Sequence, residues 1–212
     1  MPDGLPNSGF NHLTDTMVHK LIDNFISYEN NYLESGNEFT IVELEGNLYH
    51  KFNIDGTPVY LSGFADRIDK TKDDTIRILD YKSGSVDKSD VQIGEIADKA
   101  EGIDILSKIP EKALQLLIYK YLYKMMNDNI DISKIRPAIL GLLKNGDVLF
   151  KLINKSNNFN DDNFVDSCNF LFESLFKEIL NKDIPFVQTA DENKCSICSY
   201  TSVCKRYPKS GW

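Results

Sequence analysis

The sequence predicts an α/β fold, in which a central mixed β-sheet with an antiparallel β-meander is flanked by helices. Three observations predict this class: an amphipathic helical repeat near the start, three successive runs rich in β-branched and aromatic residues, and two later helical repeats separated by another pair of β runs. We expect helices over residues 12–33, 110–127 and 164–179, and strands over 39–54, 57–69, 75–82, 135–144 and 147–153.

The three helices are predicted from apolar spacing and from start signals. Apolar residues recur at every fourth position from Leu13 to Phe25, which places them on one face of the first helix. The second helix begins at Pro110, because proline is well tolerated in the first turn of a helix. The third carries an apolar stripe that includes Cys168.

Turn residues predict how the strands connect. Asp55-Gly56 lies between the first two β runs and Lys72-Asp73-Asp74 between the next two, so we expect three antiparallel strands. Asn145-Gly146 predicts a further two-residue hairpin between the last two runs. The polar segment 83–109 has no sustained period and is expected to be a mobile connection.

Length and composition indicate one globular domain over residues 1–212, with a frayed lead-in at 1–10 and a cysteine tail at 195–204. No apolar run is long enough for a membrane span and no signal peptide is visible, so we expect a cytoplasmic protein with no membrane partner. The net charge of −8 argues against binding nucleic acid by bulk attraction; contact with DNA is expected to be local or aided by a more basic partner. The sequence contains neither G-x-x-x-x-G-K-[ST] nor G-x-G-x-x-G, so it does not indicate a nucleotide-hydrolysing or dinucleotide-binding domain.

A carboxylate and an ammonium stand at the end of an otherwise apolar strand face. Residues two apart point to the same side of a strand, so Asp80 and Lys82 share a face with Ile76 and Ile78. Asp66 ends the preceding run, and a hairpin would bring its carboxylate close to that of Asp80. Two carboxylates suit Mg²⁺ or Mn²⁺, with water and phosphate completing the coordination. A surface ion pair is the alternative interpretation.

The strings GFADRID and ILDYKSG, followed by a helix that contains LQLLIY, resemble the nuclease motifs of the PD-(D/E)XK superfamily and most closely those of RecB/AddB-type nuclease domains. The resemblance covers about residues 40–207. It implies a restriction-endonuclease-like core and exonuclease-like, metal-dependent hydrolysis of DNA. It also implies a role in recombination or double-strand-break repair, with a helicase subunit or domain as partner.

The resemblance assigns roles to the strand-end residues. Asp66 and Asp80 match the metal-binding aspartates, and the Tyr81 carbonyl can add a ligand. Lys82 matches the lysine that orients or activates the attacking water and offsets charge on the scissile phosphate.

Two further motif elements lie outside these strand ends. Gln115 and Tyr119 match the family's Q-x-x-x-Y element, and their spacing places both on one helix face; ordinary core packing is the alternative for Tyr119. The family also has an acidic residue ahead of the hairpin, which matches Glu45 better than Glu43, although spacing cannot choose between them.

Three cysteines in the tail indicate a soft metal site. Cys195, Cys198 and Cys204 form a C-x₂-C-x₅-C pattern, for which zinc with a fourth ligand from elsewhere would be the default. By resemblance they match three ligands of a [4Fe–4S] cluster whose fourth cysteine lies far upstream. Cys168 is expected to be a core residue instead. We therefore expect the cluster in the complete protein, and zinc or an empty site in this chain.

The histidines do not match the metal-proximal histidine of the family. His12 and His19 lie on the first predicted helix, which resembles the element after the family's histidine helix, and His50 is expected to be solvated. The missing histidine and fourth cysteine together imply the carboxy-terminal part of a longer nuclease. Two other classes stay open: a catalytically inactive nuclease-fold module that binds DNA or a helicase, and a zinc-stapled structural domain with a chance Asp-x-Lys.

Overall fold

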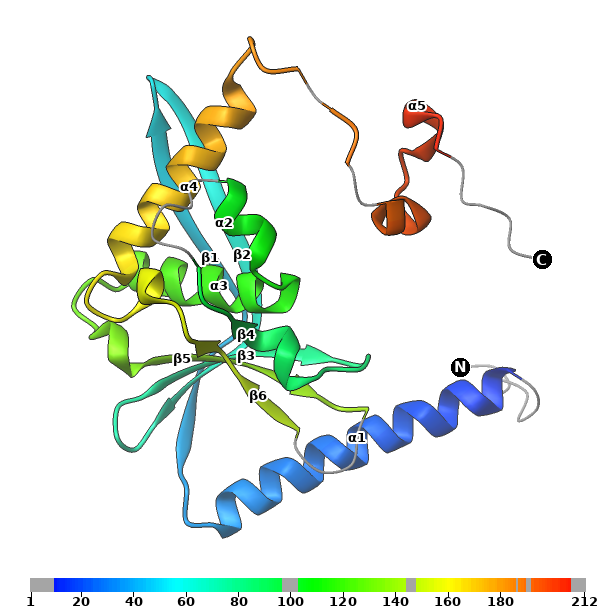
Figure 1. Ribbon diagram of the computed structural model, residues 1–212. Helices are drawn as coiled ribbons and strands as arrows, with labels where there is room; N and C mark the ends of the chain where they lie inside the picture. The colour runs from blue at the N-terminus through cyan, green and yellow to red at the C-terminus, as the bar shows by residue number, and fades with distance from the viewer. Residues whose placement is uncertain (1–9, 97–102, 144–147, 186, 190–191, 207–212) are drawn as a thin grey trace. The chain divides into compact units, whose positions relative to one another are not determined.

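Residues 10–96, 103–143, 148–185, 187–189 and 192–206 are described by a computed structural model of the chain (Figure 1). The chain divides into two compact units, Met1–Lys177 and Glu178–Trp212. The first contains the sheet, and the second contains the cysteine-rich tail. The single domain expected over residues 1–212 stays a prediction.

A mixed five-stranded sheet in the order β1–β2–β3–β5–β6 forms the centre of the first unit. β1, β2 and β3 make an antiparallel meander, β3 pairs with β5 in parallel, and β6 is antiparallel to β5. The predicted class, a central mixed sheet with a meander and flanking helices, is confirmed. These strands span Phe39–Ile54, Thr57–Thr71, Ile76–Lys82, Ile135–Gly141 and Leu149–Lys151.

Helices cover both faces of this sheet, and Figure 1 shows α1 on the opposite side from α3. Ile76 and Ile78 of β3 share a buried cluster with Leu116 of α3. On the other face, Leu79 is buried with Tyr28 of α1 packed against its cluster. Among the described residues, none of the helices combines the length and apolar character needed to span a bilayer. The helices are α1 (Phe10–Glu34), α2 (Ile103–Lys108), α3 (Glu111–Met126), α4 (Phe164–Leu180) and α5 (Thr201–Cys204).

The turns of the meander follow their sequence signals. Ile54 pairs with Thr57, which leaves a two-residue hairpin in which Asp55 and Gly56 have φ values of 48° and 85°. Positive φ at both positions is the geometry that Asp-Gly favours. The next turn, over 72–74, ends at Asp74 with φ 62°. The hairpin expected at Asn145-Gly146 lies outside the described residues.

The connection expected over 83–109 is wrong in part, because this segment contains structure. It holds a 3₁₀ turn, the short strand β4 (Gln92–Ile93) and α2. β4 pairs in parallel with β7 (Ile153–Asn154), and Ile93 is fully buried. Elements of two to six residues are too short to show a hydrophobic period, which is why the sequence pattern missed them.

Candidate metal and nuclease site

Asp66 and Asp80 lie where the pairing of β2 with β3 ends. The last pair in register is Arg67 with Leu79, so these two aspartates occupy the next positions on the two strands. There the Tyr81 N–H donates to Asp66 Oδ2 at 2.5 Å, so a carboxylate replaces the backbone acceptor of a continuing ladder. The structure thus brings the two aspartates to the same end of the meander, as the sequence predicts.

Asp80 is almost fully buried, with 4% of its surface exposed, and α3 supplies its hydrogen bond. Gln115 Nε2 donates to Asp80 Oδ1 at 2.8 Å and lies 2.8 Å from the Tyr119 hydroxyl. The Tyr119 hydroxyl donates to the Phe64 carbonyl oxygen at 2.6 Å and lies 3.4 Å from Asp80 Oδ1. Because a phenol has one proton, the bond to Phe64 is its donated bond. Gln115 and Tyr119 therefore form one network with Asp80 and are more than core packing.

Lys82 completes the charged group on this face. Its Nζ lies 2.8 Å from Asp80 Oδ2, and 34% of the lysine side chain is exposed. Residues Ile76 and Ile78 on the same face are buried against α3, as the strand parity predicts. The Lys82 ammonium thus neutralises the buried Asp80 carboxylate and remains accessible to solvent.

The pKa of the Tyr119 hydroxyl is raised by burial and by the nearby carboxylates of Asp80 and Asp66. Burial raises its pKa to about 12, and the negative charges of Asp80 and Asp66 act in the same direction, while the hydrogen bond with Gln115 opposes them. Tyr119 is consequently a protonated donor over the whole neutral range. Gly63 makes room for its ring, since a Cβ there would lie 3.0 Å from Tyr119 Cε1.

In the part of the chain that the structure describes, neither Glu43 nor Glu45 is grouped with Asp66 and Asp80 as a third metal ligand. Glu45 lies opposite Asp66, because Leu44 pairs with Arg67 and Gly46 with Ala65, but Glu45 is exposed and has φ 53°. The carboxyl group of Glu43 lies instead beside Gly46, within 3.4 Å of where a Cβ would stand. In the part of the chain that the structure describes, no three His, Cys, Asp or Glu side chains are grouped to hold a metal.

The residues present nevertheless fit a divalent cation of the hard type. Mg²⁺ is commonly bound through one or two carboxylates, with water and substrate phosphate supplying the other ligands. Asp80 contributes a fixed carboxylate and Asp66 a half-buried, accessible one. Lys82 already supplies one positive charge at Asp80, as expected where negative charge gathers.

Sequence reasoning missed a buried ion network on the opposite face of the meander. Asp69 Oδ2 accepts bonds from Arg67 at 2.8 Å and from Arg77 at 2.6 Å, and Arg67 also reaches Glu29 of α1 at 3.1 Å. Asp69 has no exposed surface. The available signal was the alternation of charged with apolar residues in β2 and β3, which indicates a second polar face beneath α1.

The histidines are not site residues in this arrangement. His19 is exposed and bonds through Nδ1 to the Asp15 carbonyl at 2.8 Å, and the His12 side chain lies outside what the structure describes. His50 was expected to be solvated, which is wrong: it is half-buried, 4.8 Å from the Phe52 ring and 5.8 Å from Tyr121, edge to face. This burial lowers the pKa of His50.

The tail thiols surround one small space. Cys195 lies in the 3₁₀ turn Glu192–Ile197, Cys198 follows that turn, and Cys204 ends α5; all three line a cavity of about 90 Å³. Arg206 Nη1 lies 3.8 Å from Cys195 Sγ. They do not form a ligand group among the described residues.

Cys168 is not a fourth ligand in the first unit. It is fully buried on α4, where burial raises the pKa of its thiol, as expected of a core residue. A [4Fe–4S] cluster needs four ligands. Three thiols that do not converge on one point do not fit such a cluster within the described residues.

Comparison with known proteins places the chain in a family. The sequence profile of the PD-(D/E)XK nuclease superfamily matches residues 4–205. No curated protein matches. Five solved chains do; one of them, titled "Crystal structure of SSO0001", is 11% identical, with 86% of this chain and 67% of that chain covered and a TM-score of 0.37. The mixed sheet is consistent with a restriction-endonuclease-like fold. Because the profile covers nearly the whole sequence, this chain belongs to the PD-(D/E)XK nuclease superfamily.

Proposed function

We propose that the protein is a divalent-metal-dependent deoxyribonuclease that acts at Asp66, Asp80 and Lys82. The observation that carries this proposal is the meeting of these three side chains where β2 and β3 stop pairing, with Asp80 held by α3. Superfamily membership supports a nuclease function, a divalent metal and a DNA substrate.

Asp66 and Asp80 are proposed to bind the metal, and Gln115 to hold Asp80 in place. Asp66 and Asp80 would hold Mg²⁺ or Mn²⁺, with the Tyr81 carbonyl as a proposed further ligand. Glu45 is exposed and lies opposite Asp66 in the register of β1 and β2, so its carboxylate would have to turn toward the cation to add a ligand. When bound, the cation supplies a lower pKa for a coordinated water and charge stabilisation at the phosphate. Gln115 fixes Asp80 Oδ1 through its 2.8 Å bond, so the carboxylate needs no reorientation.

Lys82 and Tyr119 act on either side of that carboxylate. Lys82 is exposed enough to reach a substrate phosphate, where its ammonium would orient the attacking water and offset developing negative charge. Tyr119 positions Gln115 and the Phe64 carbonyl, so it is a positioning residue.

The proposal includes a finer assignment. The motif strings support a RecB/AddB-type, exonuclease-like nuclease module that works in the cytoplasm with a helicase in recombination or repair. A net charge of −8 fits a module that relies on a more basic partner to hold DNA. Binding of a candidate helicase, measured with the full chain, tests the partner.

Cleavage of end-labelled DNA tests the activity directly. We expect products with Mg²⁺ or Mn²⁺, none with a chelator, and a loss of orders of magnitude in Asp80→Asn. Asp128→Asn, which changes an exposed aspartate, is the matched control and should cleave like the wild type. Products that form equally in Asp80→Asn would contradict the proposed site.

A second candidate is a catalytically inactive nuclease-fold module that binds DNA or a helicase. It is favoured by the absence, among the described residues, of a third metal-ligating side chain grouped with the two aspartates. This candidate predicts DNA or helicase binding that needs no divalent metal and gives no cleavage with any cation.

We propose that the cysteine tail binds zinc or stays empty in this chain. A [4Fe–4S] cluster would form only in a longer protein that supplies a fourth ligand. The C-x₂-C-x₅-C spacing of Cys195, Cys198 and Cys204 supports a metal role. Zinc and iron analysis of the purified chain tests it, with Cys198→Ser as the variant. A metal-free chain whose melting temperature does not change in Cys198→Ser, together with a longer, anaerobically prepared protein that lacks both metals, would contradict it.

A further inference from the structure

A small cavity lies on the face of the sheet that α1 covers. Its volume is about 170 Å³, and its walls come from the end of α1, the β2–β3 turn, β3, β5 and β6. Leu79 and Ala138 pair with each other and are buried on the α1 side of the sheet. Arg77 and Arg136 precede them by two positions, so their side chains lie on the same face. Lys151 pairs with Ala138 and shares that face, so the register brings three basic side chains to one cavity.

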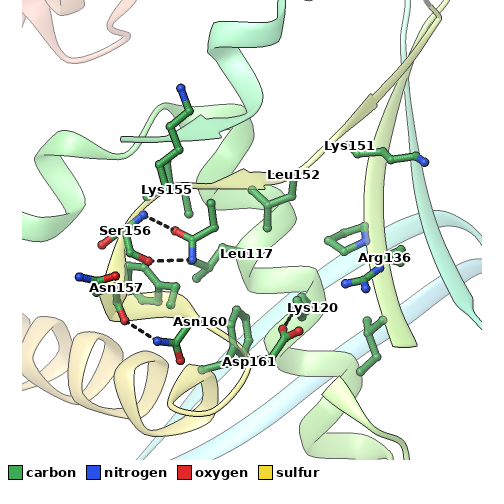
Figure 2. Close-up of a pocket in the computed structure, with 16 residues that line it drawn as sticks. Leu117, Lys120, Arg136, Lys151, Leu152, Lys155, Ser156, Asn157, Asn160 and Asp161 are labelled. Carbon is green, nitrogen blue, oxygen red and sulfur yellow. Dashed lines mark hydrogen bonds and ion pairs between the residues drawn. The ribbon is translucent and has the colours of Figure 1, made fainter. Parts of the chain in front are cut away.

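This cavity is separate from the metal site. Asp80 has the opposite parity to Arg77 in β3, and it bonds to Gln115 of α3 on the other face of the sheet. Figure 2 shows the Lys151 side chain leaving β6 in the direction away from Leu117 and Lys120 of α3. The sheet therefore stands between this cavity and the position of the cation.

The cavity has more positive than negative charge. Three of the charged side chains that line it are basic and one is acidic: Arg77, Arg136, Lys151 and Asp73. The local balance is therefore +2 in a chain whose net charge is −8. The Asp73 carboxylate accepts bonds from the hydroxyls of Thr71 and Thr75, at 2.6 and 2.8 Å. Arg136 and Lys151 are exposed and make no ion pair with any residue that the structure describes, so this space attracts anions.

Arg77 is the buried member of this group, with 8% of its side chain exposed. Its Nη2 donates to Asp69 Oδ2 at 2.6 Å, and its guanidinium lies 4.3 Å from the centre of the Tyr32 ring, which also lines the cavity. Its Nε and Nη1 have no hydrogen-bond partner among the described residues. Buried donors are rarely left without an acceptor, because the loss costs about 1–3 kcal/mol. An anion bound beside Arg77 would supply the missing acceptor.

We propose that this cavity binds a phosphate group, with Arg136 and Lys151 at its mouth and Arg77 at its inner end. Guanidinium groups suit phosphate because their planar fork can donate two parallel bonds. The volume of about 170 Å³ is below the roughly 300–1,000 Å³ of sites that enclose a whole organic ligand, so the rest of a larger ligand stays outside. The phosphate can be free, part of a nucleotide or part of a DNA strand, since all three present the same chemistry.

Calorimetric titrations of the full chain, at constant ionic strength and with a chelator present, test the site. The probes are inorganic phosphate, deoxyadenosine, deoxyadenosine 5′-monophosphate and a short single-stranded oligonucleotide. At least one phosphate-containing probe should bind, and deoxyadenosine should not. Arg136→Ala should weaken the binding about tenfold, because a charge-assisted bond to phosphate is lost. Lys151→Ala should weaken it less, and Lys177→Ala, on exposed α4 surface, should not change it. Arg136 and Lys151 are exposed, so neither change should impair folding.

The outcomes distinguish this site from the nuclease centre. Asp80→Asn should bind the probes like the wild type even if the chain never cleaves DNA. Equal, Arg136-dependent binding of inorganic phosphate and the monophosphate indicates a site for the phosphate group alone. Tighter binding of the monophosphate indicates a nucleotide, and tighter binding of the oligonucleotide indicates a strand. Binding that is absent for every probe, equal for deoxyadenosine, or unchanged in both Arg136→Ala and Lys151→Ala would overturn the site.

Discussion

Lys82 is the residue whose role can be separated most cleanly from folding. The Lys82 side chain is 34% exposed but its partner Asp80 is buried, so removing the ammonium leaves a buried carboxylate unpaired unless a cation takes its place. With Mg²⁺ present to neutralise Asp80, we expect Lys82→Ala to lose DNA cleavage by orders of magnitude while its melting temperature stays near that of the wild type. Lys112, 32% exposed in its ion pair with Asp90 on the same side of the sheet, provides the control Lys112→Ala. Loss of activity in proportion to the unfolded fraction would make Lys82 a structural residue.

Gly63 shows how tightly the Tyr119 ring is held. An alanine Cβ would approach Tyr119 Cε1 to 3.0 Å, so Gly63→Ala must displace a ring that is buried and bonded to Phe64. Overpacking of this kind destabilises by about 1–3 kcal/mol, which urea unfolding can measure. Gly84→Ala, where a Cβ meets nothing within 4 Å, should change stability little. Equal effects of both changes would show that the Tyr119 ring shifts freely.

Cys168 gives a prediction about pH. Burial raises the pKa of its thiol above the usual 9.0, so the folded chain binds that proton more tightly than the unfolded chain does. This contribution to stability is present below pH 9.0 and declines as the pH rises toward the folded pKa. At neutral pH, a thiol-modifying reagent should label exposed Cys198 and leave Cys168 unlabelled until the protein unfolds, as mass spectrometry can show. Equally rapid labelling of both would contradict the burial of Cys168.

Among the elements, α1 depends on the charged face of the meander. Asp69 sits between Arg67 and Arg77, and Arg67 joins them to Glu29 of the helix. Asp69→Ala leaves two buried guanidinium groups without their shared partner, so we expect a loss of about 3–5 kcal/mol in the free energy of unfolding. Asp128→Ala removes an exposed carboxylate away from this network and should cost less than about 1 kcal/mol. A small effect of Asp69→Ala would mean that packing alone holds α1.

Across the whole molecule, long elements and the strand-end site could be predicted, because both depend on local spacing. β1 begins and ends where its β-branched run does, and the parity of Ile76, Ile78 and Asp80 predicted which face α3 covers. β4 and α2 were missed because short elements carry no period. His50 was misjudged because its neighbours Phe52 and Tyr121 meet only in the folded chain.

The site at Asp66 and Asp80 could be predicted, since one hairpin brings both residues together and each lies in its own motif string. A site can therefore be predicted from the sequence when consecutive strands of one hairpin supply its residues.

Calorimetric titration of Mn²⁺ into the full chain tests the central claim most directly, because the metal site precedes any activity. The two aspartates repel each other at the end of the meander, and a divalent cation should relieve this repulsion. We predict that the wild type binds Mn²⁺, that Asp66→Asn and Asp80→Asn each abolish most of the heat, and that Asp128→Asn binds like the wild type. Binding that is the same in all four proteins, or absent from the wild type, would contradict a metal site at Asp66 and Asp80.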